Sequence, residues 1–477
     1  MNWQTIVKEN NLDVSVINCS KVERFRIDAD FYSQKFLHNE NQIKKMQTYP
    51  LSELCIIKSG TTPKDRDDEL REGVVLLKTT DIRNKSLASG TSYYYISEKL
   101  AEKMKSTQLQ KGDVLMNIVG ATLGVIGRVS IVPDDFPKAN ITQAMAMIRT
   151  KNESLLSGYI FTFLLSKYGN LQAQRLARPT GQYNLNLQEV SAIRIPIIDK
   201  DFQKSISKLV SDFQILSDRS VKTYNDAEQL LLKEINLEGY KTSDENVSIR
   251  NFKDCIADNR FDAEYWQPKY DEMIKKVSLV PQKELGDIVS TKKGVETGSE
   301  AYSEEGKLFI RVSDFSIYGI DEGEKRISED LYEKLKENYR PHKGEVLFTK
   351  DGTIGISFAL HEDADAIVSG AFLRLKPNIK INNDYLALAL NSSFCKRQIE
   401  RMSGGAIIAH LKPDSAMKIK IPMLSDRKQV ELADKVSDAL RLRKEAKTLL
   451  EKAKKAVEIF IEENEDRACA YLDENYE

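Results

Sequence analysis

An internal repeat restricts how this 477-residue chain can fold, because a duplicated sequence predicts a duplicated fold. Residues 26–36 read Arg, an apolar residue, Asp-Ala, an acid and two aromatic residues, and they end in Lys and another aromatic residue. Residues 260–270 repeat this pattern. Further pairs follow in the same order: residues 52–54 with 283–285, 77–82 with 310–315, 96–98 with 327–329, 111–115 with 343–347, 193–196 with 419–422 and 210–212 with 436–438. The sequence therefore predicts two similar domains in tandem, related by a pseudo-twofold axis.

The chain length agrees with this division, since 477 residues are too many for one ordinary hydrophobic core. Each copy alternates short apolar runs, as at 74–77 and 308–310, with helical stretches at 158–173 and 384–400. The last strand of each copy is Ile-x-Ile-Pro, and it ends at the proline because proline has no N–H to donate to a neighbouring strand. We predict a mixed α/β (α+β) fold for each domain.

A long helix is predicted after each Ile-x-Ile-Pro strand, over residues 202–234 and 429–462, where Pro and Gly are missing. Apolar or small residues recur three and four positions apart, and a polar residue interrupts the series at Ser217 and at Arg443. We expect the two helices to pack as an antiparallel coiled coil. The alternative is that each helix lies on the surface of its own domain.

Composition indicates the environment of the chain. Hydrophobic residues make up 41% and charged residues 30%, and no apolar run approaches the ~20 residues of a membrane-spanning helix. The N-terminal stretch lacks the apolar core of a secretion signal, and the five scattered cysteines form no CxxC pair. We expect a cytoplasmic protein with reduced thiols.

Signatures of catalysis and metal binding are missing from the sequence. The four histidines stand in no HExxH or Cys/His cluster, and no phosphate-binding loop, no GxSxG and no Asn-Pro-Pro-aromatic stretch occurs. We expect no catalytic residue, no metal and no cofactor on this chain. The net charge of −1 argues mildly against a stand-alone DNA-binding protein, although a local basic groove or a basic partner would supply phosphate contacts.

Polar loops carry side chains that can pair with the edges of DNA bases. Arg, Gln and Asn gather in residues 178–184, and residues 401–412 form a flexible, basic counterpart. Cations and hydroxyls follow a strand at 78–83 and again at 311–314. Each of these could instead be a solvated loop or a capped turn. The candidate DNA-binding residues are Lys78, Thr79, Thr80, Arg83, Arg178, Thr180, Gly181, Gln182, Tyr183, Asn184, Arg311, Ser313, Lys350, Arg401, Ser403, Gly404, Gly405, His410 and Lys412.

The chain resembles the specificity subunits of Type I restriction–modification systems over nearly its whole length. The resemblance is strongest in the glycine-containing loops that lead to Ile-x-Ile-Pro, at 181–196 and 404–422. The Lys-Gly-acid-Val-Leu strand and the long helices also resemble the family. The resemblance implies two target-recognition domains that read the halves of a split, asymmetric site in double-stranded DNA. It implies two adenine methyltransferase subunits and translocating endonuclease subunits as partners, and these would bind S-adenosylmethionine, ATP and Mg²⁺.

Two different half-sites are expected, because residues 78–80 differ from 311–313 and residues 182–184 differ from 406–408. Three other readings stay open: a subunit of a fused methyltransferase–nuclease of the Type IIB kind, an enzyme with an unrecognised site, and a coiled-coil scaffold without DNA contact. The predicted segments are a first target-recognition domain (1–198), a spacer helix (199–240), a second target-recognition domain (241–424), a second spacer helix (425–465) and an acidic tail (466–477).

Overall fold

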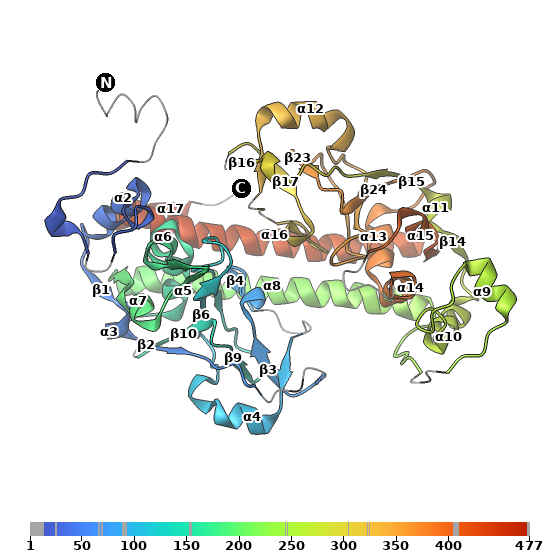
Figure 1. The fold of residues 1–477 in the computed structure, drawn as a ribbon, viewed down its shortest axis with the longest axis horizontal. Coiled ribbons are helices and arrows are strands. Elements are labelled where there is room, and N and C mark those ends of the chain that lie inside the picture. The colour runs from blue at the N-terminus through green and yellow to red at the C-terminus, as the bar shows by residue number, and fades with distance from the viewer. Residues whose placement is uncertain are drawn as a thin grey trace. The chain divides into compact units, whose positions relative to one another are not determined.

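The chain folds into two compact units, which alternate strands and helices (Figure 1). Unit 1 comprises Met1–Asp218 and Lys444–Glu477, and unit 2 comprises Arg219–Arg443. Among the described residues, no helix combines the length and the apolar character needed to cross a membrane. The computed structural model describes residues 14–23, 26–64, 67, 70–87, 93–151, 155–243, 245, 247–303, 305–321, 323, 325–403 and 410–474.

Three sheets and a strand pair form the β-structure of unit 1. Its strands are β1 (Thr48–Pro50), β2 (Cys55–Ser59), β3 (Val74–Leu77), β4 (Lys85–Ser86), β5 (Tyr95–Ile96), β6 (Val114–Asn117), β7 (Val119–Gly120), β8 (Val129–Ile131), β9 (Ala139–Ile141), β10 (Met145–Thr150), β11 (Arg178–Thr180), β12 (Gln182–Asn184) and β13 (Arg194–Pro196). The strand orders are β2-β10-β6-β8-β4, β5-β3-β9, β11-β12-β7 and β1-β13. The α-helices are α2 (Gln34–Ile43), α3 (Leu51–Leu54), α4 (Glu98–Lys103), α5 (Ser157–Leu165), α6 (Lys167–Leu176), α7 (Leu187–Ala192) and α17 (Glu465–Asp473).

Unit 2 has a closely similar set of elements. Its strands are β14 (Gln282–Glu284), β15 (Val289–Lys293), β16 (Tyr302–Ser303), β17 (Lys307–Ile310), β18 (Phe315–Ser316), β19 (Gly319–Ile320), β20 (Arg326–Ile327), β21 (Val346–Thr349), β22 (Ser357–Ala359), β23 (Ala366–Val368), β24 (Phe372–Pro377) and β25 (Lys420–Pro422). The strand orders are β15-β24-β21-β22, β16-β20-β17-β23, β18-β19 and β14-β25. The α-helices are α9 (Phe252–Asp258), α10 (Pro268–Val277), α11 (Leu285–Ile288), α12 (Glu329–Tyr339), α13 (Asn383–Asn391), α14 (Ser393–Ser403) and α15 (Pro413–Ala416).

Equivalent strands pair in the same way in the two units, as the repeat predicts. The Ile-x-Ile-Pro strand, β13 or β25, is antiparallel to β1 or β14. The buried strand β3 is parallel to β9, and its equivalent β17 is parallel to β23. The mixed α/β prediction is therefore correct for each unit taken by itself.

The helices predicted over 158–173 and 384–400 are each interrupted at a serine. Ser166 caps α6, because its Oγ donates to the carbonyl oxygen of Phe163 (2.6 Å) and accepts from the N–H of Gly169 (3.5 Å). Ser392 donates in the same way to the carbonyl oxygen of Ala389 (2.6 Å). A serine hydroxyl competes with the backbone for helix hydrogen bonds, so one predicted helix becomes two, α5 with α6 and α13 with α14.

The repeated Lys-Gly-acid sequence is explained in unit 1 by an ion pair between Asp113 and Arg149. The two carboxylate oxygens of Asp113 lie 2.7 and 2.6 Å from Nε and Nη2 of Arg149. Asp113 also accepts from the N–H of Gln110 (2.7 Å), which closes the turn before β6. Gly112 takes a φ of 79° in this turn, and Gly344 takes 84° in unit 2, a region that favours glycine.

Two long helices, α8 (Lys200–Glu234) and α16 (Asp426–Glu462), are unbroken along their length (Figure 1). Within unit 1, the first half of α8 and the second half of α16 share one core, in which the rings of Phe202 and Phe460 lie 5.5 Å apart. Within unit 2, Ser220 Oγ donates to the carbonyl oxygen of Ala439 (2.7 Å), and Lys428 pairs with Glu234 (2.9 Å). These two contacts run in opposite directions along the two helices, so the segments in unit 2 are antiparallel.

The polar interruptions of the apolar series fall where the chain passes between units. Ser217 precedes the boundary after Asp218, and Arg443 precedes the boundary at Lys444. The Ser217 hydroxyl is buried without a hydrogen-bond partner, and the Arg443 guanidinium lies 5.1 Å from the ring centroid of Tyr318. Each unit therefore has its own stretch of apolar contact between the two helices.

Candidate nucleic-acid interface

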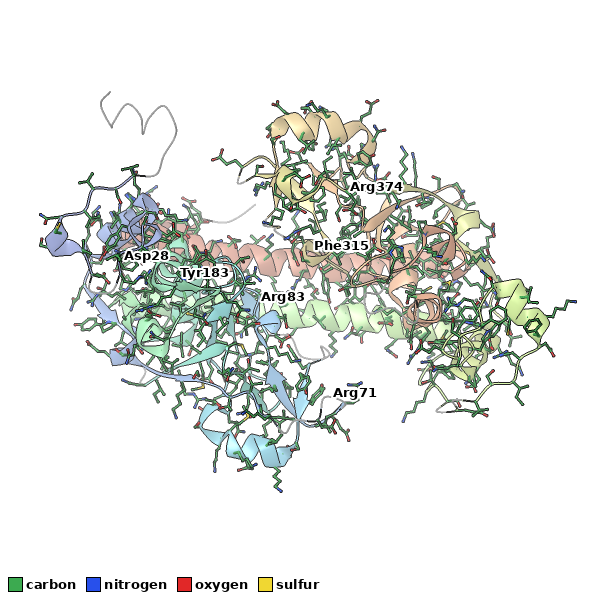
Figure 2. The ribbon with its side chains drawn as sticks, viewed as in Figure 1. Asp28, Arg71, Arg83, Tyr183, Phe315 and Arg374 are labelled. Atoms are coloured by element: carbon green, nitrogen blue, oxygen red, sulfur yellow. The ribbon has the colours of Figure 1, made fainter. Side chains whose placement is uncertain are left out.

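The loop after β3 holds cations around a capped turn. The Asp81 carboxylate accepts from the backbone N–H of Lys78 (2.7 Å), and burial raises the pKa of Asp81. Arg83 Nε donates to the carbonyl oxygen of Thr80 (2.9 Å), and the Lys78 ammonium lies 3.9 Å from the ring centroid of Tyr94. Lys78, Thr80 and Arg83 are exposed, so the turn presents two cations and a hydroxyl to solvent (Arg83 is labelled in Figure 2).

The hairpin of β11 and β12 carries the second predicted group of unit 1. Thr180 pairs with Gln182 across a turn formed by Gly181. Gly181 has a φ of 80°, which disfavours other residues, although no atom lies within 4 Å of the place where a Cβ would stand. The hairpin tip is therefore narrow, and the Gln182 side chain is exposed beside it.

An ion pair anchors this hairpin to α7. Arg178 Nε lies 2.6 Å from Oε1 of Glu189, and Oε2 of Glu189 accepts from the N–H of Asn186 at the start of α7 (2.8 Å). Tyr183 and Asn184, farther along β12, are half-buried (Tyr183 is labelled in Figure 2). The exposed part of Arg178 is thus held in one place by a nearly buried carboxylate.

Residues 117–120 bring the two predicted loops of unit 1 together. Asn117 Nδ2 donates to the carbonyl oxygen of Thr79 (3.0 Å), and Val119 pairs with Asn184 in the ladder of β7 and β12. Asn117 is fully buried, and sequence reasoning missed it. Its position at the end of the Lys-Gly-acid strand, where the second copy has Thr349, was the available signal.

The first loop of unit 2 has the same capped turn, but its cation, Arg311, is paired with Asp314. Arg311 Nε and Nη2 lie 3.1 and 3.2 Å from the two carboxylate oxygens of Asp314. The buried Asp314 also accepts from the N–H of Arg311 (3.1 Å) and from the hydroxyl of Ser313 (3.1 Å). Ser313 is exposed, whereas Arg311 is half-buried and tied to the turn that it precedes.

Lys350, Asp351 and His410 form a cluster of polar side chains in unit 2. The Lys350 side chain is buried and pairs with Asp351, which also pairs with the imidazole of His410. His410 is exposed, and so is Lys412 at the start of α15. Gly404 and Gly405, which the sequence also suggests for DNA contact, lie outside the described residues.

Backbone hydrogen bonds show how this cluster corresponds to the hairpin of unit 1. The N–H of Leu185 donates to the carbonyl oxygen of Ile118 (2.8 Å), and the N–H of Leu411 donates to that of Lys350 (2.8 Å). His410 therefore occupies the position of Asn184. The sequence comparison pairs residues 182–184 with 406–408, which lie outside the described residues. The backbone hydrogen bonds instead pair residue 184 with residue 410, two positions later.

Arg401 and Ser403 belong to the last turn of α14 and not to the loop that the sequence predicts. Ser403 Oγ donates to the carbonyl oxygen of Ile399 within the helix (2.8 Å). The Arg401 side chain is 13% exposed, and its Nη1 lies 3.0 Å from Oδ1 of Asp271. Its Nε donates to the carbonyl oxygen of Tyr265 (3.0 Å), so the guanidinium is engaged inside unit 2.

The counterpart of Arg401 in unit 1 is Arg175 and not Arg178. Arg175 Nε donates to the carbonyl oxygen of Phe31 (3.0 Å), and its guanidinium lies 4.2 Å from the Phe31 ring centroid. Arg401 lies 4.4 Å from the ring centroid of Tyr265 in the same arrangement. This geometry favours a structural role for Arg401.

Two exposed lysines at equivalent edge strands were not predicted. Lys58 lies on β2 and Lys292 on β15, each two residues before a glycine that is closely approached by the chain. A Cβ added at Gly60 would lie 1.8 Å from the carbonyl oxygen of Ile141. Lys58 and Lys292 occupy equivalent positions in the two copies of the repeat, and this equivalence was the sequence signal that could have identified them.

The chemistry that these loops offer is recognition through hydrogen bonds and charge. Lysine and arginine donate to guanine edges and phosphates, and glutamine and asparagine pair with adenine. Across the part of the chain that the structure describes, no group of three or more His, Cys, Asp or Glu side chains is placed to bind a metal ion. The arrangement suits reading of DNA grooves.

Comparison with known families gives two matches to one family. Residues 43–227 and residues 275–454 each match the family described as Type I restriction modification DNA specificity domain. The two stretches together cover more than half of the chain, and each contains one copy of the repeat except its first segment, since residues 26–36 and 260–270 lie outside them.

Two curated proteins of Methanocaldococcus jannaschii are similar over most of their length. The MjaVIII specificity subunit of a type I restriction enzyme is 22% identical over 382 residues, which cover 76% of this chain and 82% of the relative. A protein described as the MjaX specificity subunit is 21% identical over 431 residues, which cover 85% of this chain and 89% of the relative.

Solved structures of similar description cover 90% of the chain. The crystal structure of a Type-I restriction-modification system S subunit from M. genitalium has 16% identity and a TM-score of 0.34, and 96% of it is covered. That of the HsdS subunit from Thermoanaerobacter tengcongensis has 15% identity and a TM-score of 0.27, with 95% covered.

Proposed function

The chain belongs to the family of Type I restriction modification DNA specificity domains, and we propose that it reads a split, asymmetric DNA site for a Type I restriction–modification complex. It is a specificity subunit and not a catalytic one; the two relatives are described as specificity subunits of type I restriction enzymes. Methyl transfer and DNA cleavage are the work of partner subunits. S-adenosylmethionine, ATP and Mg²⁺ are bound by those partners, and the complex acts on DNA in the cytoplasm.

One observation supports two different half-sites more than any other: equivalent turns in the two units carry different polar side chains. The cation before the capped turn is exposed in unit 1 (Lys78) but paired with Asp314 in unit 2 (Arg311), and the next loop has Asn184 in unit 1 and His410 in unit 2 at one position. Different donors at equivalent places read different bases. A palindromic site would instead call for the same side chains in both units.

The DNA-facing set is drawn from the exposed members of the predicted residues. In unit 1 these are Lys78, Thr80, Arg83 and Gln182, with Arg178, Tyr183 and Asn184 beside them on the hairpin. In unit 2 they are Ser313, His410 and Lys412. Lys350 and Arg401 act as positioning residues, because their charges are paired and their side chains are largely buried. Lys58 and Lys292 add phosphate contacts.

The helices α8 and α16 set the gap between the half-sites. In this proposal they form one antiparallel coiled coil, and the two target-recognition domains (1–198 and 241–424) are related by a pseudo-twofold axis. The 35 residues of α8 span ~52 Å, or ~15 base pairs of B-DNA, so the helices are long enough to hold the two domains more than one helical turn of DNA apart. Two methyltransferase subunits and the endonuclease subunits assemble on this frame.

The test is a map of methylated adenines in the host genome, with the gene present, deleted and restored. We expect one bipartite, asymmetric motif to lose its methylation on deletion and to regain it on restoration. A palindromic motif would contradict the assignment of different half-sites to the two units. Unchanged methylation in the deletion strain would contradict the function as a whole.

A further inference from the structure

The capped turn of unit 1 is held at its centre by a buried side chain, that of Asn117. Asn117 Nδ2 donates to the carbonyl oxygen of Thr79 (3.0 Å), and a second hydrogen bond to this oxygen, from the N–H of Ile82, is longer (3.4 Å). Asn117 is fully buried, and a hydrogen bond away from water is stronger than an exposed one. Asn117 therefore fixes the backbone between the exposed side chains of Lys78 and Thr80.

Within the described part of the chain, the side-chain amide of Asn117 makes this hydrogen bond and no other. A carbonyl oxygen accepts only from an N–H, so the contact with Thr79 fixes which way the amide points. The Oδ1 atom of Asn117 is buried and has no hydrogen-bond partner among the residues that the structure describes. A change of the Asn117 side chain therefore acts on the capped turn through a single hydrogen bond.

The backbone directly after Asn117 holds the hairpin of β11 and β12. The carbonyl oxygen of Ile118 accepts from the N–H of Leu185 (2.8 Å), and Val119 pairs with Asn184 in the ladder of β7 and β12. Three consecutive residues, 117–119, therefore contact both loops, the first through its side chain and the other two through their backbone. A displacement of the capped turn and a displacement of the hairpin both act on this one short segment.

Unit 2 has a different side chain at the equivalent position, and its contacts stay within one loop. Thr349 ends β21 as Asn117 ends β6, and it is also fully buried. The Thr349 hydroxyl donates to the carbonyl oxygen of Thr353 (2.6 Å) and accepts from the N–H of Ile356 (2.9 Å). Both partners lie in the loop that follows β21, whereas the capped turn of unit 2 is held by its own carboxylate, Asp314.

We propose that Asn117 is a positioning residue that holds the two loops of unit 1 in a fixed relation, so that they select bases together, whereas the two loops of unit 2 select bases independently. Side chains that share one frame depend on each other, because loss of one contact shifts the other. Side chains on separately held loops contribute independently. The inference rests on the proposed function, in which these loops contact DNA bases, and it adds a dependence between the two loops of one unit.

The test is a double-mutant cycle in unit 1, measured on the full chain together with its methyltransferase subunits. Arg83→Ala, Gln182→Ala and the double variant are compared on duplexes that carry the mapped motif and on duplexes with one base pair of a half-site changed. The measured quantity is the ratio of the initial methylation rates on the two kinds of duplex. We expect the effect of the double variant on this ratio to differ from the product of the two single effects by about fivefold or more.

Two variants of Asn117 should remove this coupling. In Asn117→Ala and in Asn117→Thr, the effects of Arg83→Ala and Gln182→Ala should multiply. Threonine is the residue of unit 2 at this position and suits a strand, so it serves where alanine impairs folding. The matched control is Asn39→Ala, which should keep the coupling. Asn39 is also buried, its Nδ2 donates to the carbonyl oxygen of Tyr168 (3.2 Å), and its Oδ1 likewise has no partner among the described residues.

The same cycle in unit 2 gives the contrast between the units. The effects of Ser313→Ala and His410→Ala should multiply, and this comparison needs no variant of Asn117, so it stays decisive even where both Asn117 variants fail to fold. Independent effects in unit 1, equal coupling in both units, coupling that persists in the Asn117 variants, or its loss in Asn39→Ala would each overturn the inference. A wild-type complex that methylates no specific motif would instead refute the proposed function.

Discussion

Arg374 and Glu345 form a bidentate ion pair in the interior of unit 2, where Nε and Nη2 of the arginine each lie 2.9 Å from a carboxylate oxygen. Their side chains are 2% and 8% exposed, and Glu345 also accepts from the N–H of His342 (3.0 Å). The pair joins β24 to the turn before β21, and Asp113 with Arg149 does the same in unit 1 (Arg374 is labelled in Figure 2).

Removal of one partner of this pair is expected to destabilise unit 2 strongly. Arg374→Met leaves a buried carboxylate without its cation, which costs about 3–5 kcal/mol in the free energy of unfolding. Chemical denaturation followed by circular dichroism measures this loss. Lys380→Met, which breaks the exposed pair with Asp426, should change the free energy of unfolding far less, because water and salt screen an exposed ion pair. Equal effects of the two substitutions would show that burial does not determine how much the Arg374–Glu345 ion pair contributes to the free energy of unfolding.

Substitutions in the reading loops are expected to affect one half-site each. Gln182→Ala should relax base preference in the half-site of unit 1 by about 1–3 kcal/mol, and His410→Ala should do so in the half-site of unit 2. Sequencing of methylated DNA from cells that carry each variant measures the preference at every position. Each variant is the control for the other, and a loss spread equally over both half-sites would contradict the assignment of the loops.

Longer helices are expected to widen the gap between half-sites and to leave their sequences unchanged. Seven helix-forming residues inserted after Asp218, with seven more after Arg443, would add about 10 Å, or about 3 base pairs, and would preserve the apolar series. The methylated motif of the variant gives the new gap. An unchanged gap in an active variant would mean that α8 and α16 do not set the spacing.

The cysteines are expected to react with thiol reagents in an order set by burial. Burial raises the pKa of Cys55 to about 12 and that of Cys395 to about 12, so neither forms a thiolate near neutral pH in the folded chain. Cys19 is exposed. Labelling followed by peptide mass spectrometry should find Cys19 modified first, and Cys55 and Cys395 only in denaturant. Rapid labelling of Cys395 in the native protein would contradict the packing of α14.

The contact between His361 and Asp384 is expected to make stability depend on pH. The hydrogen bond that Nε2 of His361 donates to Oδ1 of Asp384, 3.1 Å away, raises the pKa of His361 above its ordinary value. The stabilisation is therefore fully present below the pKa of the unfolded state and is lost as the pH rises through the raised pKa. It amounts to at most about 1 kcal/mol, because half of the imidazole is in solvent.

A double-mutant cycle with His361→Asn and Asp384→Asn, measured at pH 5.5 and 8.5, isolates this contact. The coupling between the two residues should be larger at pH 5.5. A coupling that is equal at the two pH values would show that the protonated imidazole adds nothing.

Local patterns in the sequence predict much of the fold. Both long helices are where the spacing places them: α8 begins at Lys200, two residues before Phe202, and ends at Glu234 as predicted. The Lys-Gly-acid strands are also found, at β6 and β21. The role of the acid could not be seen, because Asp113 and Arg149 are joined only by the antiparallel pairing of β6 with β10.

The candidate site was harder to predict because the two copies differ in length between their anchors. Arg401 was assigned to a loop from its nearness to Gly404, but α14 extends to Ser403 and turns the side chain toward Asp271. The hydrogen bonds of Leu185 and Leu411, together with the pairing of Asn184 with Val119 and of His410 with Asp351, show which residues of the two copies correspond. Side chains that pair inside a unit, such as Lys350, cannot be told from free cations by sequence alone.

Unit 1 is made of the two ends of the chain, and unit 2 is made of the middle. On the ribosome, all residues of unit 2 are therefore present once residue 443 has emerged. At that point the core of the first 218 residues still lacks Ala446, Ala453 and Val457. Synthesis from the N-terminus ordinarily favours the first domain. Here the order is reversed, and a truncated product without its last 34 residues would keep a finished second half beside an unfinished first half.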